Sequence, residues 1–209
     1  MADKLDFKKE YKDLYFPGKE PALLTVPPMT FLMVDGAGAP EGESYQTAIP
    51  LFYTVAFTIK MSKLGPWQPE GYVDYTVPPL EGLWEGAGKT LPADRNSWKW
   101  TSLMRVPDYV TPEVFAWAVG EASRKKPGPD YSRIRLERYE EGLCAQVMHV
   151  GPYAEEQGTL DRLDAFVKRE GLIDRTPEGR LHHEIYLGDP RRTVPERLKT
   201  VLRHPVRRK

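Results

Sequence analysis

The order of the expected secondary-structure elements occurs twice along this chain, and the repeat restricts the fold more than any other feature. The segments MVDGAGAPEGESYQTAI and MHVGPYAEEQGTLDRL share an apolar strand, a glycine, a loop and the start of a helix. Laid over each other, the two halves place Asp74 opposite Glu184 and Tyr72 opposite His182. The pattern predicts two β-α-β-β units in one α+β domain, formed by antiparallel sheets with helices on one face.

Hydrophobic periodicity places the individual elements of both halves. We expect a charged N-terminal arm over residues 1–25 and a domain over 26–209, divided into pseudo-repeats at about 26–107 and 108–209. Ser44 is the expected N-cap of the first long helix, and Glu140, Glu141 and Gly142 form the expected turn of a hairpin. The predicted strands are 31–38, 71–86, 98–107, 181–188 and 198–206, with a hairpin at 134–153; the predicted helices are 44–63, 111–126 and 154–171.

The stretch HHEIYLGDPRR near the C-terminus contains the strongest functional signal. In a strand, His182, Glu184 and Tyr186 point to one face, while His183 and Ile185 point to the other. A duplicated unit leaves a groove on the uncovered sheet faces or at the seam between its halves, and this alternation places Glu184 there. A partly buried carboxylate is costly to leave unpaired, so a ligand cation would stabilise it.

Aromatic residues are dense around the same predicted groove, because the chain has five Trp and eleven Tyr. Flat aromatic walls attract cations and accept many ligand shapes. Tyr153 follows a glycine-proline pair, where it could cover the groove. Core packing, ordinary strand positions and surface ion pairs are the alternatives for each of these side chains. The expected lining residues are Tyr72, Asp74, Trp67, Trp98, Trp100, His182, Glu184 and Tyr186.

Charge and hydropathy exclude several classes of function. Thirty basic and thirty acidic residues give no net charge, which argues against nucleic acid as a partner; the basic end RHPVRRK is expected to be a solvated tail. The sequence has no apolar signal core and no apolar run long enough for a membrane span, so we expect a cytoplasmic protein. No metal or cofactor is expected: His149 and His204 are isolated, and DGAGAPEGE lacks the lysine of a phosphate loop.

The duplicated layout and HHEIYLGDPRR resemble the GyrI-like small-molecule-binding proteins over about residues 25–207. That family includes effector domains of multidrug-sensing transcription regulators. The stretch WKWTSLMRVPDYVT is similar to the stand-alone branch without a DNA-binding domain, some of whose members resemble cyclopropanoid cyclopropyl hydrolases. The resemblance implies an aromatic cage and a groove glutamate that faces polar or cationic parts of a drug. By residue match this glutamate is Glu184.

Two functions therefore remain open for the predicted groove. The first is binding or sequestration of lipophilic, often cationic, aromatic compounds, as in multidrug resistance. The second is hydrolysis of a cyclopropane-bearing alkylating drug, in which Glu184 would activate a water and a tyrosine such as Tyr153 would donate to the developing anion. A regulator that acts through a protein partner is a third possibility, for which the sequence identifies no surface.

Overall fold

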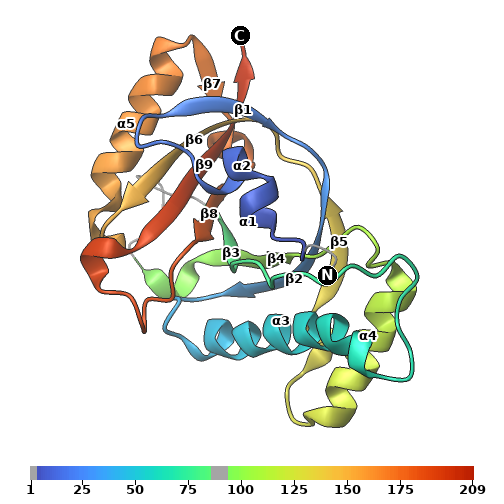
Figure 1. Cartoon of the computed structure of the whole chain (residues 1–209). Coiled ribbons are helices and arrows are strands. Elements are labelled where there is room, and N and C mark those ends of the chain that lie inside the picture. Colours follow the sequence, from blue (N-terminus) through green and yellow to red (C-terminus); the bar gives the residue numbers. More distant parts are fainter. Residues whose placement is uncertain (1–3, 86–93) are drawn as a thin grey trace.

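The computed structural model describes residues 4–85 and 94–209 of the chain (Figure 1). Residues 1–3 of the expected arm and residue 86 of the expected strand 71–86 lie outside this part. Within it, nine strands form one antiparallel sheet in the order β1-β6-β9-β8-β3-β4-β2-β5, with β7 paired to β9. The strands are β1 (Ala22–Val26), β2 (Met29–Ala37), β3 (Glu81–Trp84), β4 (Lys99–Arg105), β5 (Arg135–Tyr139), β6 (Gly142–Val150), β7 (Leu172–Asp174), β8 (His182–Tyr186) and β9 (Lys199–Arg208).

The chain has an α+β fold in which the β-α-β-β order occurs twice, as the sequence predicts. One unit consists of β2, α3 (Glu43–Met61), β3 and β4, and the other of β6, α5 (Glu156–Arg169), β8 and β9. The units meet where β3 pairs with β8, in a register that places Gly82 opposite Glu184. This seam lies at the centre of the sheet, so side chains of both halves meet there.

The expected hairpin at 134–153 is wrong, because its two strands lie in different halves of the sheet. β5 pairs with β2 of the first unit, whereas β6 pairs with β1 and β9. β1 likewise passes into β2 through Pro27 and Pro28, although these two strands lie far apart in the sheet order. Each unit therefore receives an edge strand from the segment that precedes the other unit.

The long helices follow the predicted pattern, with one difference at a helix start. α3 begins at Glu43 with Gly42 as its N-cap, so Ser44 lies in its first turn rather than at the cap. α4 (Pro112–Lys125) begins as predicted, because the Thr111 hydroxyl accepts a hydrogen bond from the Val114 amide. α3 and α5 bury their apolar stripes against the sheet on either side of the seam.

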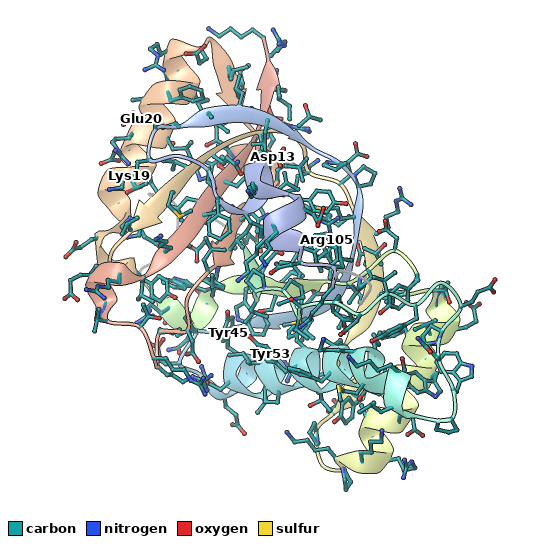
Figure 2. The ribbon with its side chains drawn as sticks, viewed as in Figure 1. Asp13, Lys19, Glu20, Tyr45, Tyr53 and Arg105 are labelled. Carbon is teal, nitrogen blue, oxygen red and sulfur yellow. The ribbon has the colours of Figure 1, made fainter. Side chains whose placement is uncertain are left out.

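The N-terminal segment is packed into the domain. α1 (Phe7–Glu10) and α2 (Lys12–Tyr15) lie within the curve of the sheet (Figure 1), and the side chains of Phe7, Leu14 and Tyr15 are buried. The guanidinium of Arg105 stacks on the Phe7 ring, and Figure 2 shows Arg105 beside this segment. Phe7, Leu14 and Tyr15 belong to the main hydrophobic core of the domain. The division of the chain into an arm over residues 1–25 and a domain over 26–209 stays a prediction.

Two further expectations about strands are corrected. The end RHPVRRK is no solvated tail: β9 runs to Arg208, and Arg203 and His204 are buried within it. The expected strand 71–86 shortens to four residues because Pro78 and Pro79 lack the amide donors that a sheet requires.

No helix in residues 4–85 and 94–209 is both long and apolar enough to span a membrane.

Candidate small-molecule site

A cavity of about 1200 Å³ lies over the seam, between α3 and α5. Its floor is formed by β3 and β8, and the segment after β8 closes one side. The cavity therefore lies on the face that carries the helices, at the seam between the halves. The lining includes Tyr45, Ile49, Tyr53, Phe57, Leu80, Trp84, Trp98, Tyr153, Glu156, Gln157, Leu160, His182, Glu184, Tyr186, Asp189 and Arg191.

One wall is an apolar and aromatic stripe on α3. Tyr45, Ile49, Tyr53 and Phe57 recur at intervals of four residues, which places them along one side of the helix. Figure 2 shows Tyr45 and Tyr53 extending from this helix. Tyr53 and Phe57 remain 39% and 47% exposed, so their rings are open to the cavity rather than buried in the core. Such a wall suits a flat, lipophilic ligand.

The floor of the cavity is an aromatic cluster held by hydrogen bonds. The Trp84 ring stacks on Tyr45 at 5.9 Å between ring centroids and makes an edge-to-face contact with Trp98 at 6.0 Å. Trp84 Nε1 donates to the Tyr186 hydroxyl at 2.9 Å. Both side chains pass over Gly82, which leaves room for them because it has no Cβ.

Gly82→Ala is expected to disrupt this floor. The added Cβ would lie 2.8 Å from both Trp84 Nε1 and the Tyr186 hydroxyl oxygen, so the two side chains must separate. We expect aromatic ligands to bind about tenfold more weakly, with a stability loss of about 1–3 kcal/mol. Fluorescence titration and thermal unfolding measure both effects. Gly120→Ala is the control, since a Cβ there meets nothing within 4 Å; unchanged binding in Gly82→Ala would contradict this description of the floor.

Each carboxylate oxygen of Glu184 has a hydrogen-bond partner. An indole N–H can only donate, so the Tyr186 oxygen accepts from Trp84, and the Tyr186 O–H donates to Glu184 Oε2 at 2.8 Å. Burial, reinforced by the charge of Glu184, raises the pKa of Tyr186, which therefore keeps its proton. His182 Nε2 lies 3.1 Å from Glu184 Oε1. Each carboxylate oxygen has two lone pairs, so Glu184 can still accept a proton from a molecule in the cavity.

A second carboxyl group, Glu156 at the start of α5, lines the same cavity. Burial raises the pKa of Glu156 far above its ordinary value, and the negative charge of Glu184 adds to the effect. Its Oε1 is buried and has no hydrogen-bond partner within the described residues. Glu156 therefore holds a proton at neutral pH. The cavity combines a hydrogen-bonded carboxylate with a neutral carboxylic acid, a pairing that supports general acid–base chemistry.

Of the residues expected at the groove from sequence, five line the cavity. Glu184, Tyr186 and His182 come from β8, as the alternation of that strand predicts, and Trp98 and Tyr153 border the cavity from its two halves. The edge of one ring of the Tyr153–Tyr186 pair meets the face of the other at 6.1 Å between centroids. Whether these side chains contact a ligand stays a prediction.

The two other tryptophans expected at the groove lie outside the cavity lining. Trp100 is 3% exposed, and its ring covers Gly36 while contacting Tyr45 at 4.9 Å between centroids. It supports the aromatic floor, because cross-strand pairing places it next to Trp84 on the same face of the sheet. Trp67 packs on Trp117 of α4 at 4.4 Å between ring centroids, at a different place on the molecule.

Tyr72 and Asp74 also lie away from the cavity. Asp74 forms ion pairs with Lys60 at 2.6 Å and Lys63 at 2.7 Å, and these hydrogen bonds hold the pKa of Asp74 well below its ordinary value. The Tyr72 hydroxyl donates to the backbone carbonyl of Lys60 at 2.5 Å. The superposition of Asp74 on Glu184 was therefore wrong: the strand that pairs with β8 begins only at Glu81.

Several cavity residues were missed from sequence, although some left a signal. The four-residue spacing of Tyr45, Ile49, Tyr53 and Phe57 has more aromatic character than a core stripe needs. The predicted strand 71–86 includes Trp84, but no sequence pattern assigns this side chain to the groove. Glu156 lies within AEEQ, which is typical of an exposed first turn of a helix, and nothing local in the sequence predicts its burial.

The fold and the cavity define a small-molecule-binding protein with an aromatic site between two β-α-β-β units. Residues 19–207 match the GyrI-like small molecule binding domain, and the chain belongs to this family. The structure is similar to that of a hydrolase from Listeria innocua, with 51% sequence identity and a TM-score of 0.92, over 98% of this chain and all of that one. A second structure of a hydrolase from the same organism has 50% identity and a TM-score of 0.91, with the same coverage.

A more distant structure supports the fold alone. The C-terminal domain of EcmrR has 14% identity and a TM-score of 0.56, over 91% of this chain and 98% of that domain. No match was found among curated proteins.

Proposed function

We propose that the protein is a hydrolase that opens the cyclopropane ring of DNA-alkylating cyclopropanoid drugs inside this cavity. The pairing of Glu184 with a protonated Glu156 in one aromatic cavity is the observation that supports this most strongly. The similar Listeria innocua structures, described as hydrolases at 50% and 51% identity, add to the support. A cavity of about 1200 Å³ also has room for a polycyclic drug.

The two carboxyl groups divide the acid–base work of the proposed reaction. Glu184 accepts a proton from water while the water oxygen bonds to the cyclopropane methylene carbon. The carbon–carbon bond of the ring breaks, and its electrons move to the conjugated carbonyl oxygen of the drug, which becomes a phenolate. Glu156 donates its proton to that oxygen. The product is the drug plus one water, and one proton must return from Glu184 to Glu156 before the next cycle.

Tyr153 is the proposed second donor to the developing anion. Burial, together with the charge of Glu184, raises the pKa of Tyr153 to about 12, so its hydroxyl stays protonated at neutral pH. The hydroxyl can therefore stabilise the phenolate without being consumed. His182, Tyr186 and Trp84 orient Glu184, and the rings of Trp98 and Tyr53 hold the drug.

Glu156→Gln is expected to lower turnover about a hundredfold at neutral pH, because an amide cannot donate the acid proton. In the wild type the rate should also fall at alkaline pH as Glu156 loses its proton, and this limb should be absent from the variant. The pH–rate profile of a cyclopropane-bearing alkylator, followed by mass spectrometry, measures both effects. Tyr153→Phe should lower the rate and keep the alkaline limb. An unchanged limb in Glu156→Gln would remove Glu156 from the mechanism.

The same variant makes a prediction about stability. The folded state keeps a proton on Glu156 that the unfolded state loses above its ordinary pKa of 4.5. The free energy of unfolding therefore falls as pH rises above that value, by up to about 1.4 kcal/mol for each pH unit. Glu156→Gln should remove this dependence and be the more stable protein at alkaline pH. Urea unfolding at a series of pH values provides the comparison.

Binding without turnover is the second candidate function, and the aromatic walls favour it. Rings from α3 and both central strands surround the Glu184 carboxylate, an arrangement that holds aromatic cations of many shapes. In this case the protein would sequester drugs. Titration with a panel of fluorescent aromatic cations, with the mass of each compound measured afterwards, separates the two functions: sequestration leaves every mass unchanged.

A further inference from the structure

A chain of three hydrogen bonds leads away from the cavity through the half of the sheet that carries α5. His182 Nε2 lies 3.1 Å from Glu184 Oε1, and His182 Nδ1 lies 2.9 Å from His204 Nε2. His204 Nδ1 lies 2.9 Å from Asp174 Oδ2. The two imidazoles are only 2% and 5% exposed, whereas the Asp174 side chain is 24% exposed. These hydrogen bonds connect β8, β9 and β7. The proposed reaction assigns no role to Asp174, at the end far from the cavity.

Counting protons along this chain fixes how the imidazoles are protonated. Each of the three hydrogen bonds needs one proton. The carboxylate of Asp174 is ionised: burial opposes its charge, but hydrogen bonds from His204 and Thr176 outweigh burial and lower the pKa of Asp174. The proposed reaction uses Glu184 as a base, which requires a carboxylate, and in that state all three protons must lie on the four ring nitrogens. Two neutral imidazoles carry only two protons, so the pair carries one more and a single positive charge.

The surroundings place this charge on His204. Burial, more than any other factor, lowers the pKa of His182, which therefore stays neutral. Two carboxylates, Asp174 on β7 and Asp164 on α5, lie near His204, since one ligand atom from each of these three residues lies within 4.8 Å of the others. The other imidazole of the pair, His182, is next to Glu184 and the His183 imidazole of β8. A neutral His182 that accepts at Nδ1 must carry its own proton on Nε2, directed at Glu184.

We propose that Asp174 and His204 are positioning residues for Glu184: they fix the His182 tautomer that donates to Glu184 Oε1 and so hold that carboxylate in place. The inference rests on the proposed function, because it assigns Glu184 the role of base. The arrangement matches a common feature of active sites, in which an outer carboxylate orients an imidazole through its second nitrogen. The outer carboxylate here acts through two imidazoles in series.

Asp174→Asn tests the proposal by turnover. Asparagine can donate to His204 Nδ1, so the pair loses its extra proton and Glu184 loses a nearby positive charge. The acid limb of the pH–rate profile should move to higher pH, with activity reduced about tenfold on the acid side and nearly restored on the alkaline side of that limb. Asp164→Asn is the matched control, since it removes the same charge beside His204 but Asp164 is not part of the hydrogen-bond chain. The acid limb of its pH–rate profile should move less. An equal loss at every pH in Asp174→Asn would show a merely structural role and overturn the proposal.

A measurement without substrate keeps the proposal testable if no turnover is found. Nitrogen NMR of protein labelled at histidine should show wild-type His182 protonated on Nε2 and not on Nδ1, with both nitrogens of His204 protonated at neutral pH. In Asp174→Asn the His204 imidazole should become neutral. A wild-type His182 protonated on Nδ1, or a neutral wild-type His204, would overturn the inference whatever the enzyme assay shows.

Discussion

Glu184→Gln is expected to abolish hydrolysis while the cavity stays intact. The amide is nearly isosteric with the carboxylate, and its oxygen can still accept from Tyr186, but it cannot take a proton from water. General-base catalysis contributes about 10²–10⁴-fold, so the rate on a cyclopropane-bearing alkylator should fall by at least a hundredfold. Affinity for the unreacted neutral drug should change little. Single-turnover kinetics, with binding measured separately by fluorescence, distinguishes the two effects.

The matched control is Glu41→Gln, which removes a carboxylate that lines the same cavity. Glu41 is paired with Arg95 at 2.8 Å, and its side chain is 64% exposed, so its charge is largely screened by solvent. The rate of the Glu41→Gln variant should stay within about threefold of the wild-type rate. An equal loss of rate in both variants would mean that Glu184 contributes only general electrostatics, and an unchanged rate in Glu184→Gln would place the base elsewhere.

The charge of Glu184 should also be evident in binding. Cationic aromatic dyes should lose about ten- to a hundredfold in affinity on Glu184→Gln, while a neutral analogue of the same shape loses much less. A pair of titrations on wild type and variant measures the difference. If both dyes were weakened equally, Glu184 would shape the pocket rather than attract positive charge.

The second large effect is expected on stability, at the residue next to Glu184 in the strand. His183 is fully buried on the opposite face of the sheet, with Nδ1 2.9 Å from Glu141 and Nε2 2.9 Å from Glu81. Burial opposes its charge, but the two carboxylates outweigh burial and raise the pKa of His183 to about 9. Arg203 donates to Glu141 at 2.8 Å and to the Leu14 carbonyl at 2.8 Å, which ties α2 to this network.

His183→Leu should therefore cost about 3–5 kcal/mol, because two buried carboxylates lose their shared cation. In the wild type this contribution is complete below pH 6.5 and is lost as pH rises through about 9, since the folded pKa is the raised one. Chemical denaturation at neutral and alkaline pH measures both effects. His149→Gln is the control, because that imidazole contacts the Thr159 hydroxyl and a carbonyl; it should cost about 1 kcal/mol. Equal losses in the two variants would refute the special role of the network.

The sequence predicted the β-α-β-β repeat and the side chains of β8 because both depend on local patterns. Strand alternation alone places His182, Glu184 and Tyr186 on one face, and β8 is a regular strand that follows this alternation. The helices α3 and α5 follow from their apolar stripes in the same way. Local periodicity is sufficient where an element is long and regular.

The remaining features depend on contacts between distant residues. β5 and β6 are separated by two residues, as in a hairpin, yet they pair in different halves, which only the complete sheet decides. The match of Asp74 to Glu184 failed because β3 is short and follows two prolines. Glu156 looks exposed in sequence, and its burial comes from the strands that face α5. His204 appeared isolated, although β9 places it next to His182 across the sheet.

The most direct test of the proposed function is hydrolysis in water labelled with heavy oxygen. A cyclopropane-bearing alkylator is incubated with wild-type protein and with Glu184→Gln, and the products are weighed by mass spectrometry. We predict that the wild type converts the drug to a product heavier by one water, with the label on the carbon that was the cyclopropane methylene, and that the variant leaves the drug unchanged. Recovery of unchanged drug from the wild type, at concentrations where binding is saturated, would contradict hydrolysis and leave sequestration as the function.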